Sequence, residues 1–171
     1  MAFDDEHPTL LFYLFEPKLY SDGHYSERHW NFIKESIIDL NKQLKKYETK
    51  IHIYELNPVN YLKKIIKKHR VNKIFSHIET GIDFTYKRDI DIKKFCIKNG
   101  IEWVEEVRNG VFRGRKNRLN WIKDWKNYMK MKIIELDCES NDFFRLSLSK
   151  FPLLLSKSAF IISKLIFSGN I

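Results

Sequence analysis

The segment from Val107 to Lys132 has the side chains best suited to contact a ligand. It holds nine Lys and Arg residues against a single acid, Asp124, with aromatic residues among them. Cationic groups bind phosphates and aromatic faces stack on bases, so this composition is typical of a nucleic-acid-binding surface. Four of the cations are its candidate contacts: Arg113, Arg115, Lys116 and Arg118. The same spacing fits a helix that buries its aromatic rings on a sheet, and periodicity alone favours that structural interpretation.

Other chemistry has little support in the residue pattern. The six histidines form no His-x-x-x-His or His-Glu-x-x-His pair, and the two cysteines, Cys96 and Cys138, are 42 positions apart. We therefore expect neither a metal site nor a Cys-x-x-Cys redox site. His77 ends a predicted strand, where α/β sheets place ligand contacts, but a structural role is the favoured interpretation. We predict no catalytic residue in this chain.

Length, composition and net charge indicate what class of protein this chain belongs to. The 171 residues suffice for about one domain, and 43% hydrophobic with 31% charged residues is typical of a globular chain. A net charge of +9 makes an anionic partner reasonable. The acidic N-terminus differs from a secretory signal, and no run of about 18 apolar residues could span a membrane. Two lone thiols suit a reducing compartment, so a cytoplasmic location is expected.

Hydrophobic patterns typical of strands and of helices alternate along the first part of the chain. Short apolar runs predict strands at 9–15, 50–55, 73–77 and 101–105. Amphipathic stretches predict helices at 26–47, from 57 onward, at 85–99 and at 117–131. This order is typical of βαβ units, in which a parallel sheet is covered by helices on both faces. We therefore predict one α/β domain over residues 1–131.

Residues 132–171 differ in character and resemble no recognisable domain. From Ile133 onward four basic residues balance four acids, so the excess positive charge lies in the first part of the chain. The segment 151–167 is rich in Leu, Ile, Phe and Ser. A packed helix is the favoured interpretation, and a helix on a membrane surface is the alternative.

Two motifs add specific information. Residues 79–89 read Glu-Thr-Gly-Ile-Asp-Phe-Thr-Tyr-Lys-Arg-Asp, and residues 109–113 read Asn-Gly-Val-Phe-Arg. With the downstream Arg and Trp residues, they resemble the N-terminal α/β domain of the DNA photolyase/cryptochrome family, over roughly residues 9–130. The matching subgroup reads Glu-Thr-Gly-Asn-x-Trp-Thr-Tyr-x-Arg-Asp and then Asn-Gly-Val-x-Arg…Arg-x-x-Trp-x-x-x-Trp. A structural role is favoured over ligand contact for the motif residues, which are Glu79, Thr80, Gly81, Arg88, Asp89, Asn109, Gly110, Trp121 and Trp125.

The resemblance implies a Rossmann-like fold of the photolyase antenna type and a role in light-dependent repair of pyrimidine dimers in DNA, a carbon–carbon lyase reaction. In that family a large helical domain holds FAD, and some members carry an antenna pigment. Residues 132–171 do not resemble the helical domain, so we expect no cofactor in this chain and no catalysis by it alone. The family's first, central strand has no counterpart before Thr9, and we expect the tail after Ile133 or a partner chain to take its place. A stand-alone nucleic-acid-binding module and an inactive remnant are the alternatives.

Overall fold

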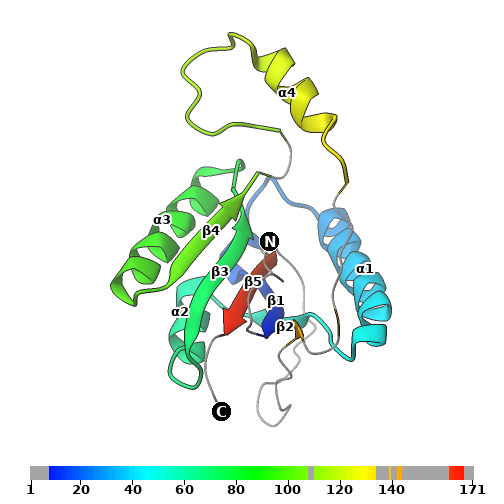
Figure 1. Cartoon of the computed structure of the whole chain (residues 1–171), viewed down its shortest axis with the longest axis vertical. Helices are drawn as coiled ribbons and strands as arrows, with labels where there is room; N and C mark the ends of the chain where they lie inside the picture. The colour runs from blue at the N-terminus through cyan, green and yellow to red at the C-terminus, as the bar shows by residue number, and fades with distance from the viewer. Residues whose placement is uncertain (1–7, 108–109, 134–138, 140–141, 144–161, 168–171) are drawn as a thin grey trace.

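The predicted alternation of strands and helices is present in the computed structural model, which describes residues 8–107, 110–133, 139, 142–143 and 162–167 (Figure 1). Two short 3-10 helices, Pro17–Leu19 and Lys45–Tyr47, supplement the main elements. In chain order these are β1 (Thr9–Phe15), α1 (Glu27–Leu44), β2 (His52–Glu55), α2 (Pro58–Ile65), β3 (Val71–His77), α3 (Asp83–Lys98), β4 (Glu102–Glu106), α4 (Trp121–Met129) and β5 (Ile162–Phe167).

The five strands form one sheet in the order β2-β1-β5-β3-β4. β1 pairs with β2, and β3 with β4, in parallel, whereas β5 runs antiparallel to both of its neighbours. Figure 1 shows α1 on one side of the sheet and α2 with α3 on the other. The fold is therefore the predicted α/β, Rossmann-like arrangement with helices on both faces.

The central position between β1 and β3 is occupied by β5, from the tail of the chain. Leu165 lies opposite Leu10 of β1 and opposite Ile74 of β3. The predicted helix over 151–167 is wrong for Ile162–Phe167, and residues 151–161 lie outside the described residues. This short segment contains Ser163 and Lys164 among four apolar residues, a pattern that is compatible with a helix or a strand. Here its pairing with β1 and β3 satisfies backbone groups of both neighbouring strands.

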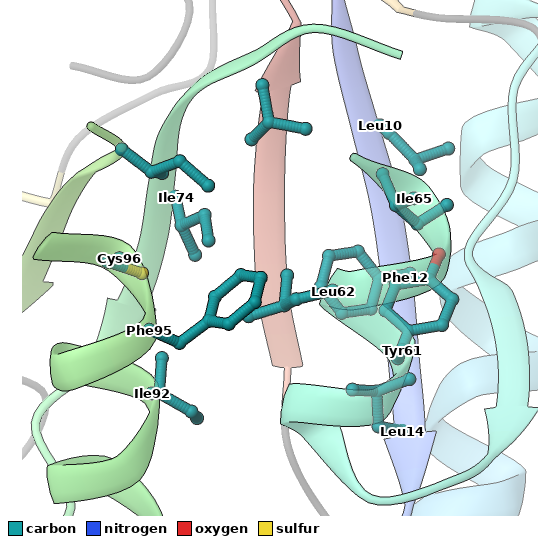
Figure 2. Close-up of a cluster of buried hydrophobic side chains, with 12 residues drawn as sticks. Leu10, Phe12, Leu14, Tyr61, Leu62, Ile65, Ile74, Ile92, Phe95 and Cys96 are labelled. Carbon is teal, nitrogen blue, oxygen red and sulfur yellow. The ribbon is translucent and has the colours of Figure 1, made fainter. Parts of the chain in front are cut away.

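β1 is buried on both faces, which explains its unbroken apolar run. Phe12 points toward α2 and α3, where its ring lies 4.7 Å from that of Tyr61 (Figure 2). On the α1 side, Tyr13 packs in a second cluster with Trp30. The buried residues of α1 are Trp30, Ile33 and Ile37, and Leu44 near the end of the helix packs against the same cluster, whereas Leu40 is 39% exposed.

Local signals place two helix ends as predicted. The Asn57 side chain accepts a hydrogen bond from the Asn60 backbone N–H at 3.3 Å, just before Pro58 at the first helical position. Gly100 follows α3 with φ of +65°, a left-handed conformation that glycine adopts without strain. Within the described part of the chain, no helix has the length and apolar character needed to cross a bilayer.

α4 departs from the favoured sequence interpretation. It has no buried residue, and Figure 1 shows it standing apart from the layers beyond β4. The prediction that its aromatic rings are buried on the sheet is therefore wrong. The physical reason is position, because α2 and α3 already cover the face of the sheet next to β3 and β4.

Candidate functional site

A group of charged side chains meets where β1 and β3 end. Glu16 follows β1 directly, and Glu79 lies two residues beyond the end of β3. Both strands run antiparallel to β5, so their carboxyl ends lie at the same edge of the sheet. The second turn of α3 brings Arg88 and Asp89 to this edge. Three segments that are distant in the sequence thus converge on one place.

Arg88 is the centre of this charged network. Its side chain is only 6% exposed, and its Nη1 donates to Glu16 Oε1 at 2.8 Å. Its Nε and Nη2 donate to Asp89 Oδ1 at 3.0 and 2.8 Å, and Nη2 also reaches Glu79 Oε2 at 3.4 Å. One planar guanidinium therefore binds three carboxylates, a geometry that a lysine cannot reproduce.

Arg113 supplies a second cation to the network. Its Nη2 lies 3.7 Å from Asp89 Oδ2 and donates to the backbone carbonyl of Glu79. Its guanidinium also lies 4.9 Å from the centre of the Tyr86 ring, a cation–π distance. These contacts connect the loop before α4 to α3.

Burial changes the protonation of the carboxylates in this network. It raises the pKa of Glu16 to about 7, although the neighbouring Arg88 opposes the change. Burial likewise raises the pKa of Asp89. In the described part of the chain, Glu16 Oε2 and Asp89 Oδ2 are buried without a hydrogen-bond partner. The network therefore holds more buried acidic oxygen atoms than its two arginines bind.

An open pocket of about 370 Å³ lies beside the network. Gly81 lies on its wall, and its backbone N–H donates to Glu79 Oε1 at 2.7 Å. A Cβ at Gly81 would lie 2.8 Å from that oxygen, so a side chain here would push the Glu79 carboxylate away. The lining residues are Glu79, Thr80, Gly81, Ile82, Asp83, Tyr86, Val111 and Arg113.

The four predicted nucleic-acid contacts differ in how they are engaged within the protein. Besides Arg113, Arg115 is engaged within the protein, where it forms an ion pair with Asp124 and donates to the Leu119 carbonyl. Lys116 and Arg118 are both exposed. The Arg118 guanidinium lies 5.7 Å from the centre of the Trp121 ring.

The remaining motif residues lie close to α4. Gly110 has a φ of +68°, and a Cβ there would come within 3.0 Å of the Trp125 ring and 3.1 Å of the Tyr128 ring. Glycine thus allows the chain to pass close beneath these rings. Asn109 lies outside the described residues.

Glu16 and Tyr86 contact the network although they are not among the residues that the sequence predicts for a site. The signal for Glu16 was available, because an acid that directly ends a fully buried strand needs a partner or a proton. The signal for Tyr86 was weaker, since its contact with Arg113 joins residues 27 positions apart. Only the fold brings that pair together.

Comparisons with known proteins agree with this architecture. The family model for DNA photolyase matches residues 1–114. The deoxyribodipyrimidine photo-lyase of Buchnera aphidicola subsp. Acyrthosiphon pisum is 27% identical over 138 residues, which cover 77% of this chain and 28% of that protein. An archaeal photolyase from Sulfolobus tokodaii, whose crystal structure contains two FAD molecules, has a similar fold with a TM-score of 0.55 and 19% identity.

The match to that structure covers 79% of this chain and 31% of the archaeal chain. The chain thus spans less than a third of the length of either relative. The family model, however, covers 114 of the 171 residues here. On that evidence this chain belongs to the DNA photolyase family.

Proposed function

We propose that this chain is the α/β part of a light-dependent DNA-repair protein that reverses pyrimidine dimers, and that it does not catalyse repair by itself. The observation that carries the proposal is the family match over residues 1–114. The network around Arg88 gives it a structural basis, because it ties the family motif at 79–89 to the end of β1. We assign this network the role of holding the strand-to-helix turn in place.

The electron donor of the repair reaction is proposed to be a flavin held by another part of the protein or by a partner polypeptide. The pocket beside Glu79 does not suit FAD, because the diphosphate of that cofactor would face the carboxylates of Glu79 and Asp83. Arg113 is the one cation of its lining, and it is already engaged with Glu79 and Tyr86. No step of the reaction is assigned to residues of this chain.

A complementation experiment tests the proposal. The purified chain is mixed with the part of the Buchnera photo-lyase that lies beyond the matched region, and dimer-containing DNA is illuminated with blue light. We expect no repair by the chain alone and light-dependent repair by the mixture. The Buchnera enzyme divided at the same place and reassembled from its own two parts is the positive control. Repair by this chain alone, or an inactive mixture beside an active control, contradicts the proposal.

A second candidate function, a stand-alone nucleic-acid-binding module, is favoured by the exposure of Lys116 and Arg118. If both cations contact phosphates, their replacement by alanine should weaken binding to single-stranded DNA and reduce the salt dependence. The log–log slope should fall by about 1.4, since each contact contributes about 0.7. The variant Lys63→Ala with Lys67→Ala removes the same charge from α2 and from the turn that follows it, and it should bind as the unaltered chain does. Equal binding by both variants would exclude this segment as the contact surface.

A further inference from the structure

α4 presents an apolar ridge that the rest of the described protein leaves uncovered. The ridge consists of Ile122, Trp125 and Met129, which are 57%, 39% and 57% exposed. Their spacing of three and then four residues places them on one face of the helix, over a length of about 10 Å. Single exposed apolar residues are common on protein surfaces, but an aligned row on one helix is typical of an interaction site.

The orientation of this helix is held by contacts on its other side. The Tyr128 hydroxyl donates to the Val107 carbonyl at 2.6 Å. Arg115 forms an ion pair with Asp124. Gly110 lies close to the Tyr128 ring and also to one edge of the Trp125 ring, which makes Trp125 the least exposed member of the ridge. The outward direction of the ridge is thus built into the packing of α4 against the preceding loop.

The charge beside the ridge indicates what would cover it. Lys123, Lys126 and Lys130 follow Ile122 by one, four and eight positions and are exposed along one border of the ridge. We propose that the ridge docks an amphipathic helix of a partner protein, whose apolar strip covers the ridge and whose Glu or Asp residues face these lysines. This inference does not depend on the proposed repair function.

Two other occupants fit the ridge less well. Nucleic acid would require aromatic faces for base stacking, whereas both ends of the ridge, Ile122 and Met129, are aliphatic. A second copy of this chain would add a second row of lysines to the interface instead of acids. An acidic amphipathic helix would cover the ridge with its apolar face and pair its carboxylates with the lysines. Amphipathic helices recognise apolar surfaces of partner proteins in this way.

The test uses the full chain and a designed peptide as the probe. The peptide has about 18 residues, with Leu at helical spacing on one face and Glu on both flanks, and a matched peptide has Lys in place of Glu. Binding is measured by fluorescence anisotropy of the labelled peptide. We expect the Glu peptide to bind at least tenfold more tightly than the Lys peptide, because only the former complements the lysine border.

Variants locate the binding surface. Ile122→Ser with Met129→Ser should weaken binding of the Glu peptide at least tenfold. Ile38→Ser with Ile97→Ser removes two apolar side chains that are 57% and 73% exposed elsewhere, and it should bind normally. Thermal unfolding establishes that both variants are folded.

Three outcomes would overturn the inference. The first is absence of binding by the Glu peptide, and the second is equal binding of the two peptides, which indicates hydrophobic adhesion without charge recognition. The third is displacement of the Glu peptide by an oligothymidylate. If replacement of Ile122 and Met129 also weakens binding of that oligonucleotide, the ridge is a nucleic-acid site.

Discussion

Arg88→Met is expected to lower the free energy of unfolding by about 3–5 kcal/mol at about pH 8. The guanidinium is almost fully buried and binds Glu16, Asp89 and Glu79. Its loss would leave the buried Glu16 carboxylate without its cationic partner and would leave Asp89 with Arg113 alone, at 3.7 Å. Urea-induced unfolding of the full chain, followed by circular dichroism, measures the change.

The pH dependence separates this electrostatic effect from a loss of packing. Burial raises the pKa of Glu16 to about 7 in the folded chain, above the value of about 4.3 for an unfolded glutamate. The folded state therefore holds a proton that the unfolded state has released, so stability falls as the pH rises from about 4 to 7. Without Arg88 the pKa values of Glu16 and Asp89 rise further. The decrease in the free energy of unfolding caused by Arg88→Met should thus be smaller at about pH 5.5, where both carboxyl groups can be neutral.

Two controls accompany Arg88→Met. Lys87→Met removes the neighbouring cation, which forms an exposed ion pair with Asp83, and should cost less than about 1 kcal/mol. Adding Glu16→Gln and Asp89→Asn to Arg88→Met removes the uncompensated charges and should restore part of the stability at about pH 8. A change below about 1 kcal/mol for Arg88→Met at that pH would show that the network does not stabilise the fold.

Leu165→Pro is expected to cost about 3 kcal/mol or more and to abolish cooperative unfolding. Leu165 lies in the middle of β5, with β1 on one side and β3 on the other. Proline has no backbone N–H to donate to either neighbour, and it is not tolerated inside a central strand. Separation of β5 would also expose the inner edges of β1 and β3, so the variant should aggregate.

Ile133→Pro is the matched control for the β5 variant. Ile133 lies after α4, is 85% exposed and belongs to no helix or strand. Substitution by proline at this position should therefore change the free energy of unfolding by less than about 1 kcal/mol. Thermal unfolding and size-exclusion chromatography compare the two variants. A Leu165→Pro chain that stays monomeric with an unchanged transition would contradict the central position of β5.

The positions of the elements could be predicted from the sequence because they depend on neighbouring residues. The apolar run of β1, Asn57 with Pro58 before α2, and Gly100 after α3 each act within a few positions along the chain. The hydrophobic periodicity of α2 is a local feature of the same kind, and Leu62 lies on its buried face. The motif at 79–89 indicated the family, whereas hydrophobic periodicity indicates only helices and strands.

The charged network and the surface of α4 could not be predicted in the same way. Arg88 binds Glu16 across 72 positions of sequence, and the motif alone does not say which acid its guanidinium meets. The sequence predicts Arg113 as a nucleic-acid contact, and its neighbours along the chain do not indicate that its guanidinium also meets Glu79 and Asp89. The periodicity of α4 predicted an apolar face correctly, yet it carries no information on whether anything covers that face.

Sequence patterns predict the kind and order of the main elements over residues 1–131, and the motif at 79–89 indicates the family. That Ile162–Phe167 is a strand, that it lies between β1 and β3, and that Glu16 meets Arg88 became known from the folded chain alone. The physical reason is the range of the interactions. Helix caps, turns and hydrophobic periods arise from contacts within a few residues, whereas strand pairing and buried ion pairs join residues that are neighbours only after folding.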